Sequence, residues 1–195
     1  MTNHIPVLDA ACAVIDWALA ETESTKQVNI AIDGACGSGK STLGAALAER
    51  YECNLFHTDD FFLRPEQRTP GRYAQPGGNV DYERFREEVL EHLADREGFS
   101  YRRFDCGSMA LGEACAVSRR RMNIIEGAYS CHPYFGDVYQ VRFFLELPFE
   151  ERRERIIARS GMEMYKRFEK EWIPMENRYF NVFGIREQCI PLSFC

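Results

Sequence analysis

The chain has 195 residues, of which 45% are hydrophobic, and this is the size and composition of one ordinary domain with a core of its own. Its formal charge of -6 combines 24 basic and 30 acidic residues, which disfavours a nucleic acid polymer or an anionic membrane as the partner. The eight cysteines form no CxxC pair and have no histidine at zinc spacing, so no metal-cysteine site is predicted.

The N-terminal part of the chain has the pattern of a surface helix. Apolar residues recur at intervals of three and four between residues 5 and 20, which predicts an amphipathic N-terminal helix over 5–22. The beginning of the chain has no basic segment ahead of an apolar run, as a signal or transit peptide would. Since no apolar run is long enough to span a bilayer, we expect a cytoplasmic protein with reduced thiols.

Short apolar strands alternate with helices along the rest of the chain. Residues 28–50 are predicted to form a strand, a glycine-rich loop and a helix. Further strands are predicted at 54–57, 122–126, 141–147 and 188–192, and helices at 82–95, 149–160 and 163–179. This order predicts an α/β fold: a single domain over 1–195 with three layers, in which helices cover both faces of a parallel sheet of about five strands. The active groove is expected at the carboxyl ends of the strands.

The segment GACGSGKST, from Gly34 to Thr42, matches the phosphate-binding pattern GxxxxGK[ST]. It follows a predicted strand and opens a predicted helix, which are the two conditions that this motif requires. Its backbone NH groups can surround a triphosphate, Lys40 can reach the outer phosphates, and the Ser41 hydroxyl can bind magnesium. We therefore predict binding of ATP or another NTP with Mg2+. The predicted nucleotide-binding residues in this loop are Gly34, Gly37, Ser38, Gly39, Lys40, Ser41 and Thr42.

Carboxylates end two of the predicted strands. Asp59 and Asp60 follow the second strand, and Glu126 ends the third, so all three are expected at the edge that carries the glycine-rich loop. Phosphoryl transfer needs in-line positioning, charge neutralisation and a carboxylate that accepts the acceptor's proton. The alternatives are a turn-forming or helix-capping role for the aspartate pair and a solvated strand end for Glu126.

Five segments in order resemble the uridine kinase and nicotinamide riboside kinase branch of the nucleoside-monophosphate-kinase-like P-loop proteins. They are IDGACGSGKST, HTDDFF, GGNVDYERF, IIEGAYS and ERRERIIARS, between about residues 28 and 179. The resemblance implies a P-loop kinase fold in which Asp59 is the general base for a nucleoside 5'-hydroxyl. It implies that Glu126 orients magnesium, beside Ser41 and Asp59, and that Asp81 binds a ribose hydroxyl.

Three arginines of the last segment share one face of a predicted helix. Arg152, Arg155 and Arg159 are spaced by three and four residues, and in the resembled family such arginines form a lid that closes on the triphosphate. We therefore expect a lid and a following helix over 149–180, with Arg155 and Arg159 catalytic beside Lys40, and Arg152 bound to the nucleotide. The alternative is a salt-bridged helix, because glutamates interleave with the arginines.

The acceptor side departs from the uridine kinase pattern. Tyr101 and the next residues, up to Asp105, stand where uridine kinases carry a Tyr-Asp-Phe segment, and they include two arginines. Residues 64–80, rich in Pro, Gly, Gln and Arg, are predicted to form a functional or a mobile loop on the substrate side. The extra arginines could suit a more anionic acceptor or be exposed charges, and Tyr101 could equally be a core residue. The predicted substrate-binding residues are Asp60, Arg72, Asp81 and Tyr101.

The leading hypothesis is an ATP-dependent small-molecule kinase that acts on the 5'-hydroxyl of a nucleoside. A kinase for another metabolite, such as pantothenate or a sugar, is the first alternative, since such proteins share the loop and the lid. A nucleotide-dependent regulatory protein without efficient transfer is the second. The expected partner is a small-molecule substrate, and the sequence leaves the oligomeric state open.

Overall fold

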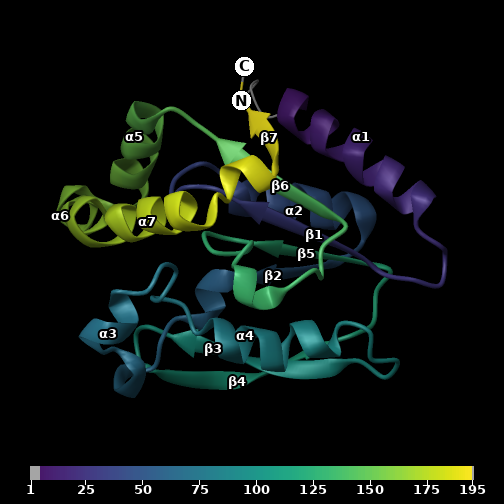
Figure 1. Ribbon diagram of the computed structural model, residues 1–195, viewed down its shortest axis with the longest axis horizontal. Coiled ribbons are helices and arrows are strands. Elements are labelled where there is room, and N and C mark those ends of the chain that lie inside the picture. Colours follow the sequence, from purple (N-terminus) through teal and green to yellow (C-terminus); the bar gives the residue numbers. More distant parts are fainter. Residues whose placement is uncertain (1–4, 195) are drawn as a thin grey trace.

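The computed structural model describes residues 5–194 and contains a five-stranded sheet with the strand order β2-β5-β1-β6-β7 (Figure 1). All four neighbouring pairs are parallel, and the central register places Ile30 beside both Ile124 and Val141. The strands are β1 Val28–Asp33, β2 Asn54–His57, β5 Met122–Glu126, β6 Val141–Glu146 and β7 Ile190–Ser193. The predicted α/β fold and its five parallel strands are therefore confirmed.

Successive residues of β1 point to opposite faces of the sheet and enter two separate cores. Ile30 and Ile32 pack with the first helices of the chain, α1 Ile5–Glu21 and α2 Lys40–Tyr51. Ala31 packs on the other face with the side chains of α4 Tyr82–Glu88 and α7 Ile173–Phe183. Because both faces are covered, the strands are apolar almost throughout, and the sheet is the middle of three layers.

The predicted helix over 163–179 is wrong in its continuity, because the structure divides this region into three parts. After α5 Phe149–Ser160 come α6 Met162–Arg167, a π-helical turn Phe168–Trp172 and then α7. Pro174 is the second residue of α7, and its ring and missing NH disturb the hydrogen bonding of the preceding turn. The wider π-helical turn accommodates this disturbance without ending the chain of helices.

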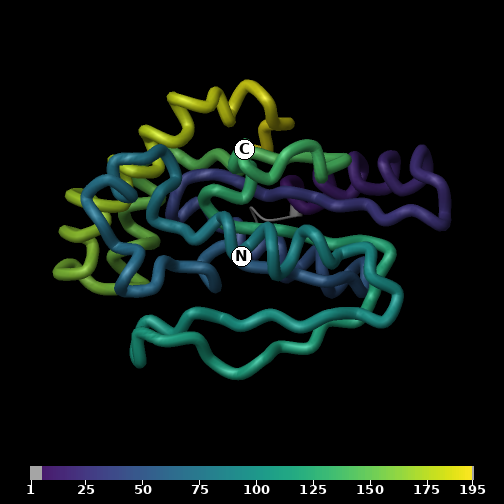
Figure 2. The backbone as a smooth tube through the Cα atoms, turned by 60° about the horizontal axis from the view of Figure 1, so that its bottom comes forward, coloured from purple at the N-terminus to yellow at the C-terminus, as the bar shows by residue number. Residues whose placement is uncertain are grey.

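An antiparallel hairpin lies apart from the main sheet, and the sequence analysis did not predict it (Figure 2). It consists of β3 Phe99–Asp105 and β4 Ala110–Val117. Only Tyr101 and Phe104 of β3 are buried, and a register shift between Arg102 and Phe104 separates them by three residues. This irregularity removes the alternation of apolar and polar residues by which a strand is recognised.

Two further segments differ from the expectation. The helix predicted over 82–95 ends at Glu88, and a 3-10 turn, Leu90–His92, follows it. The predicted loop over 64–80 contains two short helices, a 3-10 turn Pro65–Gln67 and α3 Pro70–Tyr73, and ends where Val80 bridges to Phe62. Within residues 5–194, no helix combines the length and the apolar character needed to cross a membrane.

Candidate active site

The glycine-rich loop connects β1 to α2 at the carboxyl edge of the sheet, as predicted. Gly34, Gly37 and Gly39 all have positive φ angles, of 145°, 78° and 102°. A Cβ atom at Gly34 would lie 2.5 Å from the carbonyl oxygen of Leu145, and one at Gly37 would lie 2.9 Å from that of Arg152. The loop is therefore wedged between β6 and α5, and only glycine combines this backbone conformation with such close packing.

Asp33, the last residue of β1, anchors the start of this loop. Its buried carboxylate accepts hydrogen bonds from the backbone NH groups of Gly34 (2.7 Å) and Cys131 (3.0 Å) and from the Tyr179 hydroxyl (2.8 Å). Burial raises the pKa of Asp33, and the three hydrogen bonds oppose that rise. The sequence analysis missed Asp33, although an acid at the end of an apolar strand, directly before the glycine, was a usable signal.

Lys40, the first residue of α2, is a buried cation with 8% exposure. Its Nζ donates one hydrogen bond, of 3.0 Å, to the carbonyl oxygen of Ala35, which leaves two of its three donors for other groups. Burial raises the pKa values of Asp33, Asp59 and Glu176, and the charge of Lys40 opposes the rise in all three, so Lys40 is a cation that these carboxylates share. The hydroxyl of Ser38 is buried and has no hydrogen-bond partner within residues 5–194.

Glu176 contributes a carboxylate to the glycine-rich loop from α7. It is 5% exposed, and its Oε2 accepts a hydrogen bond of 2.9 Å from the backbone NH of Cys36. Burial raises the pKa of Glu176, while Lys40 and Arg152 oppose that rise. Burial, together with Glu176, also raises the pKa of the Cys36 thiol to about 12, so this thiol stays protonated and is a poor nucleophile. No sequence pattern pointed to Glu176, which is 140 residues away from Cys36.

Asp59 and Asp60 lie in a 3-10 turn, Thr58–Phe61, that follows β2. The Asp59 side chain is accessible to solvent, yet enough protein surrounds it that loss of hydration raises its pKa. Lys40 and His57 oppose this rise, whereas Glu126 and Asp60 add to it. Asp59, Asp60 and Glu126 therefore lie at the same edge of the sheet, as expected. The role of Asp59 as a base stays a prediction.

Glu126 ends β5 and pairs with His57 at the end of the neighbouring strand β2. The Nδ1 of His57 is assigned as the donor to Glu126 Oε1, and this hydrogen bond is the main cause that raises the pKa of His57. The other carboxylate oxygen, Glu126 Oε2, is buried and has no hydrogen-bond partner within residues 5–194. His57 is a site residue that the sequence analysis missed.

Two oxygen donors of the site, one from Glu126 and one from Ser41, could bind magnesium together with phosphate and water. Among residues 5–194 there is no group of three His, Cys, Asp or Glu side chains that could hold a metal by themselves. The unpaired Oε2 of Glu126 and the hydroxyl of Ser41, the second residue of α2, are oxygen donors of the kind that Mg2+ prefers. A magnesium held here would take its remaining ligands from phosphates and water, as this ion commonly does.

Two of the three predicted lid arginines contact the glycine-rich loop. Arg152 donates to the carbonyl oxygens of Leu147 (3.2 Å) and Cys36 (3.3 Å), and Arg155 donates to that of Ser38 (3.5 Å). Arg159 is exposed and donates to the Ser160 hydroxyl. Within residues 5–194, no ion pair joins these arginines to the interleaved glutamates, so the alternative of a salt-bridged helix finds no support in the structure.

The predicted substrate-binding residues on the hairpin side are engaged with one another. Asp60 forms an ion pair with Arg103 (Nε to Oδ2, 3.1 Å) and accepts a long hydrogen bond of 3.4 Å from the Tyr101 hydroxyl. Burial raises the pKa of Asp60, and Arg103 opposes that rise. The ring of Tyr101 is 4% exposed and stacks on Phe61 at 5.5 Å between centroids. The ring is thus part of the core, and only the hydroxyl reaches the polar groups.

Arg72 and Asp81 hold the segment 64–80 in place. Arg72 donates to both carboxylate oxygens of Glu83, at 2.6 Å each, and to the carbonyl oxygens of Gly78 and Val80. Asp81 is buried, accepts from the backbone NH of Arg84 as the N-cap of α4, and accepts a second hydrogen bond from Gln67. Through these contacts Arg72 and Asp81 stabilise the conformation of segment 64–80. Their roles in binding a substrate stay predictions.

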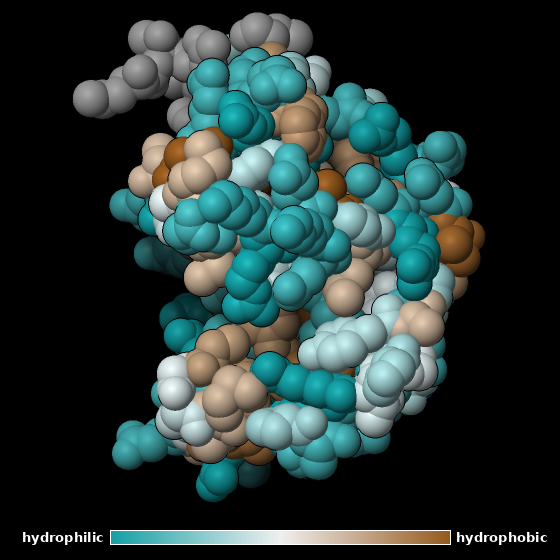
Figure 3. Space-filling view, turned by 90° about the vertical axis from the view of Figure 1, so that its left-hand side faces the viewer, coloured by the Kyte–Doolittle hydropathy of each residue, from teal (hydrophilic) through white to brown (hydrophobic). Residues whose placement is uncertain are grey.

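The carboxyl edge faces the viewer in Figure 3, where a hollow between the upper and lower parts of the molecule has mainly hydrophilic side chains above it and more hydrophobic ones below it. The shikimate kinase family matches the chain over residues 36–102, about a third of its length. No curated protein sequence matches it. Several solved structures superpose on nearly the whole chain. A possible uridine kinase from Bacillus stearothermophilus has a TM-score of 0.70 with 17% identity, and covers 97% of this chain and 98% of its own.

The fold is that of the P-loop kinases. A proposed fructose transport system kinase from Silicibacter sp. TM1040 likewise has a TM-score of 0.70, with 22% identity over 95% of this chain and 97% of its own. D-glycerate 3-kinase from Cryptococcus neoformans has a TM-score of 0.56, with 12% identity over 86% of each chain. Because solved structures named for three different acceptors share this fold, the fold does not distinguish the predicted uridine kinase branch from other kinases.

Proposed function

We propose that this chain is an ATP-dependent kinase that transfers the γ-phosphoryl group to a hydroxyl of a small molecule. The observation that carries the proposal is the gathering of Lys40, Asp59 and Glu126 around the glycine-rich loop. A cation for the phosphates, a candidate base and an unpaired carboxylate oxygen for the metal shell are the parts that phosphoryl transfer requires.

Each group has one task in this reaction. The loop NH groups and Lys40 hold the phosphates, and Ser41 and Glu126 would hold magnesium, which when bound neutralises phosphate charge. Asp59 accepts the proton of the acceptor hydroxyl, and the oxygen of that hydroxyl forms a bond to the γ-phosphorus. The bond from that phosphorus to the bridging oxygen breaks, and ADP leaves. The raised pKa of Asp59 makes it a stronger base than an ordinary aspartate.

The leading candidate for the acceptor is a nucleoside 5'-hydroxyl, on the strength of the five ordered segments. A sugar is the second candidate, because the ring of Tyr101 lies in the core, where it cannot stack on a base, and Asp81 is committed to capping α4. A sugar is recognised through its hydroxyl groups and has no aromatic base, so it needs no stacking residue. Both acceptors are consistent with Asp59 as the base.

Release of ADP over a panel of acceptors tests the proposal. The panel includes uridine, nicotinamide riboside, fructose, glycerate, shikimate and pantothenate, each with ATP and magnesium. We expect one class to raise ADP release well above the acceptor-free rate. Asp59→Asn should lower that stimulated rate about 100- to 10,000-fold and leave ATP binding nearly unchanged.

The matched control is Asp95→Asn, because Asp95 is exposed and pairs only with His92 among the described residues. It should leave the rate unchanged. If no acceptor stimulates ADP release while ATP still binds, the regulatory alternative replaces the kinase. A near-native rate in Asp59→Asn removes Asp59 from the role of base without removing the kinase.

A further inference from the structure

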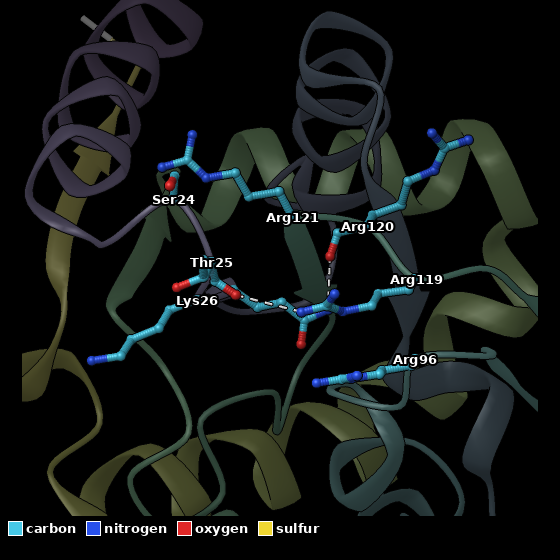
Figure 4. A pocket seen from close by; sticks show the side chains of 8 residues that line it. Ser24, Thr25, Lys26, Arg96, Arg119, Arg120 and Arg121 are labelled. Atoms are coloured by element: carbon cyan, nitrogen blue, oxygen red, sulfur yellow. Dashed lines mark hydrogen bonds between the residues drawn. The ribbon is translucent and has the colours of Figure 1, made fainter.

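A second polar cavity lies at the edge of the sheet opposite to the glycine-rich loop (Figure 4). Its volume is about 600 Å3. Three segments line it: residues 24–27 before β1, residues 119–121 before β5, and Arg96 in the connection from α4 to β3. Because β1 and β5 are parallel and carry the active-site loop and Glu126 at their carboxyl ends, this amino-edge cavity is separate from the candidate active site.

Positive charge dominates the amino-edge cavity. Five of its eight lining residues are cationic and none is acidic, in a chain whose formal charge is -6. The cationic residues are Lys26, Arg96, Arg119, Arg120 and Arg121. Only Lys26 among them pairs with a carboxylate within residues 5–194, that of Glu23, and both side chains of that pair are exposed. Four guanidinium groups line this cavity without a carboxylate partner among the described residues, so the cavity attracts anions.

Hydrogen bonds hold the backbone at Arg120 and Arg121 in place. Backbone NH of Val28 donates to the carbonyl oxygen of Arg121 (2.9 Å), and the Gln27 amide donates to that of Arg120 (2.7 Å). These bonds join the segment before β1 to the segment before β5. The stems of Arg120 and Arg121 therefore start from fixed backbone positions, which lowers the entropy lost when these side chains bind a ligand.

Most of the guanidinium donors in the cavity are free to bind a ligand. In the described part of the chain, the Arg119 side chain donates only to the carbonyl oxygen of Thr25 (3.4 Å), and that of Arg121 only to the carbonyl oxygens of Leu19 and Thr22. The side chains of Arg96 and Arg120 have no hydrogen bond or ion pair within residues 5–194. Each guanidinium has five donors in a planar fork that matches phosphate oxygens, and the hydroxyls of Ser24 and Thr25 add to this set.

The arrangement of the heads selects the class of ligand. Figure 4 shows Arg96 and Arg119 extending in the same direction, while the heads of Arg120 and Arg121 lie on opposite sides. One small anion could not reach all of these groups, whereas a chain of phosphates could bridge several of them. We propose that the amino-edge cavity binds a small polyanion with two or more phosphate groups, independently of the nucleotide at the glycine-rich loop.

Calorimetric titration with inorganic tripolyphosphate tests this site. Lys40→Ala is present in every protein, so that binding at the glycine-rich loop is weakened. We expect this background protein to bind one tripolyphosphate, and Arg96→Gln with Arg119→Gln to weaken the binding at least tenfold. Arg96→Gln with Arg120→Gln should also weaken it, and because neither side chain makes a hydrogen bond or ion pair among the described residues, this pair removes no such contact from the fold.

The control removes the same charge elsewhere. Arg167→Gln with Lys170→Gln changes two exposed cations near α6 and should leave the affinity unchanged. Equal losses in the control and the cavity variants, or no binding to the background protein, overturn the proposal. Pyrophosphate, ADP and ATP as further ligands distinguish an inorganic from a nucleotide source. Tighter binding of single-stranded RNA than of tripolyphosphate also overturns it, in favour of a polymer.

Discussion

The two edges of the central sheet both collect charge, yet they do so in opposite ways. At the carboxyl edge, Asp33, Lys40, Glu126 and Glu176 are buried, and each of them makes at least one hydrogen bond to another group of the protein. At the amino edge, the cations are exposed and their heads have few partners. Buried and hydrogen-bonded groups have a fixed geometry, as bond-making chemistry requires, whereas exposed arginines supply hydrogen-bond donors and an attraction that salt weakens. The comparison thus separates a site built for reaction from one suited to binding.

The largest effect is expected where the core supports the carboxyl edge. Phe85 is fully buried and packs edge-on against Phe61, the last residue of the turn that carries Asp59, with 4.8 Å between ring centroids. Phe85→Ala should destabilise the protein by about 3–5 kcal/mol, because it leaves a cavity beneath that turn. Chemical denaturation measures the loss. Trp17→Ala, which truncates an exposed ring on α1, is the control and should change stability by no more than about 0.5 kcal/mol. Equal losses would contradict this account.

The next effect separates the buried cation from an exposed one. Lys40→Ala should lower the turnover of the preferred acceptor by about 100- to 1000-fold, because a preorganised charge at the phosphates is lost. Lys170→Ala, on the exposed side of the π-helical turn, should leave turnover unchanged. Steady-state kinetics on both variants decide the matter, and near-native turnover of Lys40→Ala would remove this residue from the proposed mechanism.

Acid should affect the carboxyl edge through Asp59. Because the surrounding protein removes hydration from this carboxyl and raises its pKa above the usual value of 3.8, Asp59 takes up a proton at a higher pH than an aspartate in water does. The rate should therefore fall on acidification with a midpoint above 3.8, since the protonated form cannot act as a base. The pH dependence of kcat/KM measures this midpoint. A rate that stays constant down to pH values near that usual pKa would contradict the assignment.

A smaller effect is expected from neutralising Glu176. Its carboxylate lies beside a loop that must hold phosphates, so Glu176→Gln should tighten ATP binding on the order of tenfold, about 1.4 kcal/mol. The raised pKa means that the folded state binds this proton more tightly than the unfolded state does. The cost of ionising Glu176 is therefore absent at low pH and grows as pH rises toward the folded pKa.

It follows that Glu176→Gln should raise Tm at neutral pH and lose this advantage as pH falls below the ordinary pKa of a glutamate. Thermal melts at several pH values test the direction, and ATP titrations test the affinity. Glu169→Gln, at an exposed position of the π-helical turn, is the matched control. A lower Tm at neutral pH would show that the hydrogen bond to Cys36 outweighs the cost of burying the charge.

The smallest effect is expected at the amino edge. Arg119→Gln removes one long hydrogen bond of 3.4 Å from an exposed side chain, so the free energy of unfolding should change by no more than about 0.5 kcal/mol. Chemical denaturation at low and moderate salt measures it. A loss of several kcal/mol would mean that Arg119 is a structural residue rather than a ligand for a polyanion.

Local patterns in the sequence were sufficient for the sheet and for one half of the site. The glycines before Lys40 predict a loop with positive φ angles. Carboxylates that end apolar strands lie at the same edge of the sheet when the strands are parallel. These inferences hold because backbone conformation and strand direction are properties of short segments. The same reasoning failed for β3, where a register shift hides the alternation of its residues.

Only the tertiary structure decided which distant groups meet. The contact of Glu176 with Cys36 spans 140 residues, and the pairing of His57 with Glu126 spans 69. The amino-edge cavity needs three segments that no local pattern connects. Tertiary packing also decided the position of Tyr101. Its ring packs in the core against Phe61, and its hydroxyl donates a hydrogen bond to Asp60. The sequence alone therefore determined the phosphate-binding loop and its strand-end acids, whereas the packing of helices and hairpin on the sheet determined the charges around them.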